Sequence, residues 1–128
     1  MGKTVNDDAL DAMLDYIADN GDKLTVCSTE PTTYTEATST YKLADTTLTK
    51  GKGNGDYTIS DGDASGRKLT VAEQADINVD TSGDAQHIAI CDSVNSKLLY
   101  VTTCTSQALT QGNQVTVPAW DIEVADPT

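Results

Sequence analysis

The C-terminal third of the chain contains the stretch HIAICDSVNSKLLYV, residues 87–101, which gives the clearest indication of the fold. In an extended strand, Ile88 and Ile90 share one face, while Ala89 and Cys91 share the other. The polar residues DSVNS between the two apolar runs are typical of a turn that joins neighbouring strands. Because both faces of these strands are apolar, we expect two central strands that are covered on both sides.

A change of apolar phase near the C-terminus predicts a bend in the chain. The apolar residues first occupy odd-numbered positions, Val115 and Val117, and then even-numbered ones, Trp120, Ile122 and Val124. Because side chains of a strand alternate between its faces, this change needs an added residue or a break. We therefore expect a bulge or bend near Pro118-Ala119.

Residues 6–20 show the clear helical pattern of this sequence. Apolar residues recur there at steps of three and four, and the resulting stripe comprises Val5, Ala9, Leu10, Met13, Leu14 and Ile17. Asn6 is a suitable N-cap, and Gly21 a suitable stop. We expect the stripe to pack on the protein's own sheet. The alternative is that the stripe, or the arm before it, docks on a neighbouring subunit.

Shorter strand patterns occupy much of the remaining sequence, at residues 24–27, 41–48, 57–59, 69–71 and 77–79. Two polar segments, 29–40 and 51–66, are predicted to be exposed loops, and the second is rich in Gly and Asp. The fold class that we predict is mainly β (α+β), with the N-terminal helix packed on an antiparallel β-sandwich or barrel-like domain. We expect a single domain, 1–128, made of an arm (1–5), the helix (6–20) and a β domain (23–126) with its long loop at 51–66.

Composition limits both the core and the partners. The chain of 128 residues is 38% hydrophobic and has no Phe, so it can form one modest core. Its formal net charge of −12 argues against nucleic acid and anionic membranes, because both are bound through clustered Lys and Arg. The sequence shows neither the apolar core of a signal peptide nor a membrane span. We therefore expect a protein that is made in the cytoplasm and binds neither nucleic acid nor membrane.

Catalytic chemistry has little support in the sequence. Cys27, Cys91 and Cys104 lack C-x-x-C spacing and lie in apolar strand patterns, where a free thiol behaves as a small apolar group. His87 is the only histidine, and Cys91 on the same strand face is roughly 13 Å from it at the usual strand rise. Whether another cysteine approaches His87 is left open. We predict a buried, hydrogen-bonded structural role for His87, no catalytic residue, no cofactor and no enzymatic activity.

One segment resembles half of a calcium-binding loop. Asp61-Gly62-Asp63-Ala64-Ser65-Gly66 places oxygen ligands at alternating positions, with Asp61, Asp63 and Ser65 as the candidate ligands, before a glycine. The twelfth position of such a loop is normally a bidentate Glu, whereas here it is Ala72 and Glu73 comes one residue late. Because Asp-Gly and Ser-Gly also favour turns, we prefer an exposed polar loop without a metal.

Several segments together resemble a small structural protein of tailed bacteriophages. These segments are Leu24–Ser28, Pro31–Tyr34, Ala37-Thr38, Tyr41–Ala44, Asp63–Lys68, His87–Asp92, Leu98–Thr102 and Gly112–Ile122. The similarity covers most of the chain, and it is a pattern of strands and turns without a catalytic motif. The resemblance implies a non-enzymatic protein of the virion, made in the cytoplasm of a bacterial host.

Within a virion, the charge favours the outer surface, because packaged DNA repels an acidic protein. A capsid decoration (cement) protein that binds the major capsid protein is the expectation, in the form of a homo-oligomer, for which a trimer would suit sites of local threefold symmetry. The candidate contact residues lie in the N-terminal arm and the long loop: Met1, Gly2, Lys3, Thr4, Val5, Gly51, Lys52, Asn54 and Asp56. The alternatives are a low-copy head–tail or tail component, or a surface module that binds a host glycan or receptor.

Overall fold

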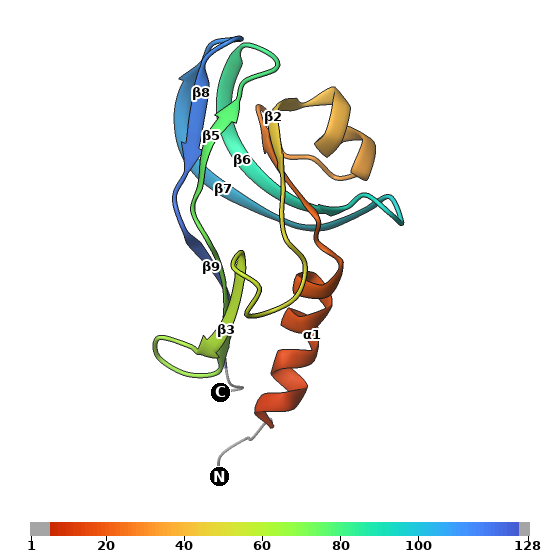
Figure 1. Ribbon diagram of the computed structural model, residues 1–128, viewed down its shortest axis with the longest axis vertical. Helices are drawn as coiled ribbons and strands as arrows, with labels where there is room; N and C mark the ends of the chain where they lie inside the picture. The colour runs from red at the N-terminus through yellow and green to blue at the C-terminus, as the bar shows by residue number, and fades with distance from the viewer. Residues whose placement is uncertain (1–5, 126–128) are drawn as a thin grey trace. The chain divides into compact units, whose positions relative to one another are not determined.

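The computed structural model describes residues 6–125, and its ribbon is shown in Figure 1. This part of the chain is mainly β, with an N-terminal helix packed on antiparallel strands, so the predicted fold class is confirmed. The elements in chain order are α1 (Asp7–Asn20), β1 (Lys23–Cys27), the short π-helical turn η1 (Glu36–Thr40), β2 (Lys42–Thr47), β3 (Tyr57–Asp61), β4 (Arg67–Val71), β5 (Gln74–Asn78), β6 (Gly83–Asp92), β7 (Lys97–Leu109), β8 (Gln114–Val117) and β9 (Trp120–Val124).

Internal contacts divide the chain into two compact units. The described residues of the first, here called the helix unit, are 6–20, 49–73 and 118–125. The second, here called the sheet unit, comprises residues 21–48 and 74–117. Both units are therefore built from segments that are distant in sequence. That residues 1–128 form a single domain stays a prediction.

In the helix unit, α1 packs on a sheet of strand order β3-β4-β9. The predicted N-cap is confirmed, because Asn6 Oδ1 accepts a hydrogen bond of 2.7 Å from the backbone N–H of Asp8. The apolar residues that α1 buries are Leu10, Leu14, Ile17 and Ala18. Ala9 and Met13 were predicted to belong to this stripe, but both are exposed, because they lie on its flank. The stripe that faces the sheet is thus narrower than the sequence pattern suggested.

Strand β3 confirms the strand predicted at residues 57–59, within the segment 51–66, and extends it to Asp61. Tyr57 is completely buried and lies opposite Val71 of β4, which in turn lies opposite Trp120 of β9. The single large aromatic ring of Tyr57 therefore fixes a five-residue strand in the middle of a Gly- and Asp-rich segment. The strand divides the predicted loop into two short loops, 51–56 and 62–66.

The sheet unit contains a four-stranded sheet of order β2-β1-β6-β7 and the pair β5-β8 (Figure 1). Strand β6 is central, and its last five residues, Ile88–Asp92, are all buried, so both of its faces are covered as predicted. The same prediction for the following strand is wrong. Strand β7 is an edge of the sheet, and the apolar residues at its start are only half-buried.

A helical turn covers one face of this sheet, where the sequence predicted an extended loop over residues 29–40. Tyr34 to Thr40 are helical, and buried Ala37 packs against Ala89 and Cys91 of β6. The turn begins with a local signal, since Thr33 Oγ1 accepts a hydrogen bond of 3.1 Å from the backbone N–H of Glu36. The pattern Thr-x-x-Glu is that of a helix capping box, and it outweighs the threonine-rich composition of the segment.

The predicted bend at Pro118-Ala119 is confirmed. Strand β8 pairs with β5, whereas β9, two residues later, pairs with β4 in a different sheet. The change of apolar phase therefore marks the point at which the chain leaves one sheet and enters another. No helix within residues 6–125 is long and apolar enough to span a membrane.

Candidate contact surface

The loop of residues 51–56 contains four predicted contact residues, and hydrogen bonds hold it in place. The backbone N–H of Gly51 donates to the carbonyl oxygen of Ala18 at the end of α1, at 2.8 Å. Asn54 Nδ2 donates to the carbonyl oxygen of Lys50 at 2.9 Å, and Asp56 Oδ2 accepts from the N–H of Thr49 at 2.6 Å. The loop is therefore a fixed feature beside α1. The other predicted contact residues, Met1–Val5, lie outside the described residues.

Gly51 and Lys52 have different roles in this loop. Gly51 has φ +95°, and a Cβ at this position would lie 2.5 Å from Asn54 Nδ2, so a side chain would disturb the turn. Lys52 Nζ lies 3.6 Å from Asp15 Oδ1 of α1, but its side chain remains 57% exposed. Among the described members of the predicted set, Lys52 is therefore the best placed to contact another molecule through its charge.

The candidate calcium ligands lie in the turn that joins β3 to β4. Asp61 Oδ1 accepts a hydrogen bond of 2.7 Å from Arg67 Nη1, and Asp63 Oδ1 accepts one of 2.7 Å from Lys68 Nζ. Each of the two carboxylates thus already faces a cation of the protein. Among residues 6–125, no group of three or more His, Cys, Asp or Glu side chains could hold a metal ion.

Arg67 also joins α1 to the sheet. Its Nε lies 2.8 Å from Asp11 Oδ1, and its Nη2 lies 3.3 Å from Asp11 Oδ2, which makes a two-point contact. Hydrogen bonds to Asp11 and Asp61 raise the already high pKa of the guanidinium further. The only arginine of the chain therefore serves the fold of the helix unit.

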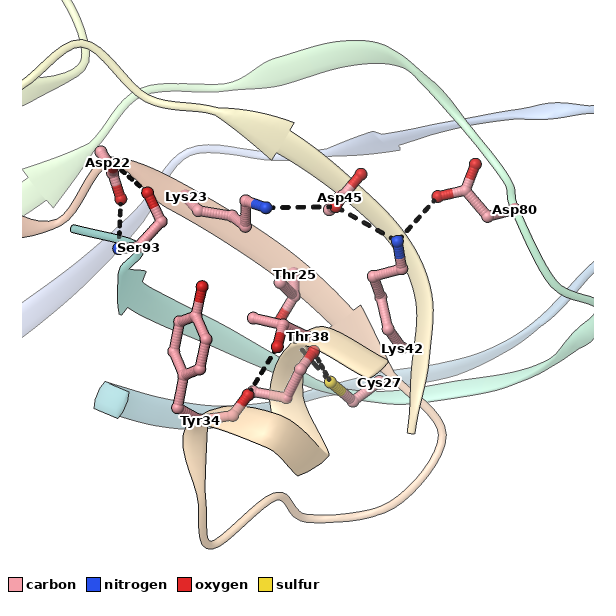
Figure 2. Close-up of polar contacts among 11 residues, drawn as sticks. Asp22, Lys23, Thr25, Cys27, Tyr34, Thr38, Lys42, Asp45, Asp80 and Ser93 are labelled. Atoms are coloured by element: carbon pink, nitrogen blue, oxygen red, sulfur yellow. Dashed lines mark hydrogen bonds and ion pairs between the residues drawn. The ribbon is translucent and has the colours of Figure 1, made fainter. Parts of the chain in front are cut away.

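A second charged network lies on the sheet unit, along β1 and β2 (Figure 2). Lys42 Nζ lies 3.3 Å from Asp45 Oδ2 and 3.3 Å from Asp80 Oδ2, and Lys23 Nζ lies 3.8 Å from the same oxygen of Asp45. Burial alone would lower the pKa of Lys42, but the two carboxylates outweigh it and raise this pKa. The network ties the segment around Asp80 to β2.

Asp22 holds the turn between β6 and β7. The backbone N–H of Ser93 donates to Asp22 Oδ1 at 2.8 Å, and the Ser93 hydroxyl donates to Oδ2 (Figure 2). Burial would raise the pKa of Asp22, but these hydrogen bonds outweigh it and lower the pKa below its ordinary value of 3.8. The charged form of Asp22 therefore stabilises the fold.

The structure places one of the thiols beside the imidazole. Cys27 lies directly opposite His87 in the β1–β6 pairing, an approach that the sequence left open. Its Sγ donates a weak hydrogen bond of 3.5 Å to the carbonyl oxygen of Ala37, and burial raises its pKa. Burial also raises the pKa of Cys91 to about 12. Both thiols are therefore protonated at neutral pH and are poor nucleophiles.

His87 itself departs from its predicted role. The side chain is half-buried, and within residues 6–125 its buried Nδ1 has no hydrogen-bond partner. His87 lies in a central strand, with Cys27 of β1 opposite it on one side and Thr103 of β7 on the other. These neighbours in the sheet explain its partial burial. The prediction of a hydrogen-bonded histidine is wrong at this atom.

Exposed apolar side chains gather on the outer side of α1. Met13 and Tyr16 are each 47% exposed, and Ala9 and Ala12 on the same side of the helix are also exposed. The helix unit thus combines a fixed loop with an exposed apolar helix face. In the sheet unit, Val94 in the turn after β6 is 73% exposed.

A feature that the sequence-based predictions missed is the distribution of charge. From Leu98 to Trp120 there is not one charged side chain, although charged residues make up 22% of the chain. This stretch includes all of the edge strand β7 except its first residue. Counting charges along the sequence would have indicated it.

Comparisons with models of protein families, with curated proteins and with solved structures find no match to this chain.

Proposed function

We propose that this chain is a non-enzymatic structural protein of a tailed-bacteriophage virion, a decoration (cement) protein that binds the major capsid protein on the outer surface of the head. The observation that supports this best is the construction of the helix unit. Its loop 51–56 is held against α1 by a backbone hydrogen bond, and α1 exposes Met13 and Tyr16. A preformed surface of this kind suits binding, because little conformational entropy is lost on contact.

The reactive groups support a structural role in place of a catalytic one. The thiols of Cys27 and Cys91 are buried and protonated, and Asp61 and Asp63 are paired with cations of the protein. These groups stabilise turns and sheets, and none of them is activated as a nucleophile or a base.

The proposed mechanism is physical. Each copy bridges neighbouring capsid subunits, and several copies on one lattice gain avidity from multiple sites. The shell is stabilised because the protein binds the assembled state and not the separated subunits. The net charge of −12 favours the outer surface, where packaged DNA does not repel the protein at short range. The proposed contacts are made by the arm Met1–Val5 and by the loop that carries Lys52.

The first test is the copy number of the chain in purified virions, measured by quantitative mass spectrometry against the major capsid protein. We expect one copy per capsid subunit, or a simple fraction of this number. A handful of copies per particle would move the protein to the neck or tail. Absence from virions would contradict the proposal, and binding of the isolated protein to host cells would favour a receptor-binding module.

A second test measures binding to expanded empty shells by co-sedimentation. We expect deletion of residues 1–5 to abolish binding, and Lys52→Glu to weaken it, while circular dichroism shows an unchanged fold. Val94→Ser is the matched control, because Val94 is exposed but lies in the sheet unit, outside the proposed contacts. If the deletion binds as well as the wild type, the arm is not a contact.

A further inference from the structure

Strand β7 is an open edge of the four-stranded sheet. It spans 13 residues and pairs on one side with β6, and within residues 6–125 no strand pairs with its other side. The opposite edge of the same sheet is covered. There the carbonyl oxygen of Leu43 in β2 accepts hydrogen bonds from the backbone N–H groups of Asp80, at 2.7 Å, and Thr81, at 3.1 Å.

The outer half of β7, residues 103–109, is also well exposed. Five of its side chains are exposed, namely Thr103, Thr105, Ser106, Gln107 and Ala108. The pairing with β6 is irregular here, because Cys104–Ser106 stand opposite the single residue Gln86. A bulge of this kind takes backbone groups out of the ladder between two strands. On the side of β7 that faces away from β6, the backbone groups have no partner strand within residues 6–125.

Apart from this bulge, the edge lacks two of the usual protections against such pairing, lysine and proline within residues 101–108. Natural edge strands commonly carry lysine or proline, which oppose the addition of a further strand. In β7 the only charged residue is Lys97 at its first position, and there is no proline. The exposed residues are mainly threonine and serine, and threonine favours extended strands.

We propose that residues 101–108 of β7 pair, antiparallel, with the same residues of a second copy of this chain. The charge pattern makes this edge the place where two copies can meet. Two copies that each carry −12 repel one another wherever their acidic surfaces meet, whereas the uncharged edge lets two backbones approach. A twofold axis makes the contact self-complementary, since each residue pair occurs twice. Threonine side chains from the two copies then form cross-strand pairs.

The pairing is tested with the purified full chain by sedimentation velocity over a range of protein concentrations. We expect a monomer–dimer equilibrium in which amide hydrogen exchange of residues 101–108 slows as the dimer forms. Thr105→Lys brings like charges together across the twofold axis, so we expect its dissociation constant to rise by about tenfold or more. Thr110→Lys is the matched control, because it adds the same charge at an exposed position just after β7, and it should dimerise like the wild type.

Several outcomes would overturn the proposal. These are a monomer at all concentrations, a trimer, or a dimer that Thr105→Lys does not weaken. If the chain stays monomeric but Thr105→Lys reduces binding to empty shells, the edge receives a strand of another protein, and pairing between copies is wrong. The sedimentation and hydrogen-exchange measurements need no virion component, so their result is independent of the proposed decoration function.

Discussion

Strands β6 and β7 are paired along most of their lengths, yet they have opposite environments. Ile88–Asp92 of β6 are all buried, whereas most of β7 after Thr102 is exposed. Both strands contain a run of apolar residues with no gap, and from the sequence both were predicted to be central. The difference teaches that an apolar run on both faces does not by itself give a strand its place in the sheet.

A further strand, β1, decides which of the two strands is central. Strand β1 pairs with β6 in register, from Lys23 opposite Cys91 to Cys27 opposite His87. This pairing joins segments that are distant in sequence, whereas β6 and β7 are joined by the short turn Ser93–Ser96. A local turn predicts that two strands are neighbours, but a long-range contact determines which of them becomes the edge.

The largest expected effect on stability comes from shortening one apolar side chain in each of the two strands by the same number of carbons. Ile90→Ala and Leu99→Ala each remove three carbons, but Ile90 is completely buried, and Leu99 is half-buried at a register shift of β7. We expect Ile90→Ala to lower the free energy of unfolding by about 2–5 kcal/mol. Leu99→Ala should lower it by about 1 kcal/mol. Urea unfolding at low protein concentration measures both values without a contribution from association. Equal losses at the two positions would show that β7 is as well covered as β6.

A smaller effect on stability is expected when a hydroxyl is added to each of the two strands. Ala89→Ser places a hydroxyl in the buried cluster beneath η1, whereas Ala108→Ser places it on the exposed part of β7. We expect Ala89→Ser to reduce stability by about 1–3 kcal/mol, because the hydroxyl loses water. Ala108→Ser should change stability by less than about 0.5 kcal/mol. Thermal unfolding of the two variants provides the comparison, and a large loss for Ala108→Ser would mean that the outer half of β7 is covered.

Features with a local cause could be predicted from the sequence. Asn6 caps α1, the apolar stripe places the helix on a sheet, and the phase change locates the bend at Pro118-Ala119. Each of these depends on a few neighbouring residues. The helical turn at 34–40 also has a local cause, the hydrogen bond from the Glu36 N–H to Thr33 Oγ1, but the threonine-rich composition concealed it.

Features that depend on distant residues could not be predicted. The strand at 57–59 was predicted, but its place in the sheet depends on β4, where Val71 lies opposite Tyr57. Loop 51–56 is fixed because the N–H of Gly51 donates to the carbonyl oxygen of Ala18 in α1. Neither partner can be identified from the residues of the loop. That the loop makes contacts stays a prediction. The structure distinguishes exposed Lys52 from Asn54 and Asp56, whose side chains form hydrogen bonds within the loop.

The smallest effect concerns the turn that joins the two strands, and it depends on pH. Because the pKa of Asp22 is lowered in the folded protein, its carboxylate adds stability at pH values above the ordinary 3.8 and loses this contribution as the pH falls through the folded pKa. Asp22→Asn should therefore reduce stability by about 1 kcal/mol at pH 7, where an amide oxygen accepts from Ser93 less strongly than a carboxylate. Urea unfolding of both proteins between pH 7 and pH 3 should show the difference shrinking at the acid end. A difference that stays constant with pH would mean that the charge of Asp22 does not hold the turn, and that β6 and β7 are kept together by the strand pairing alone.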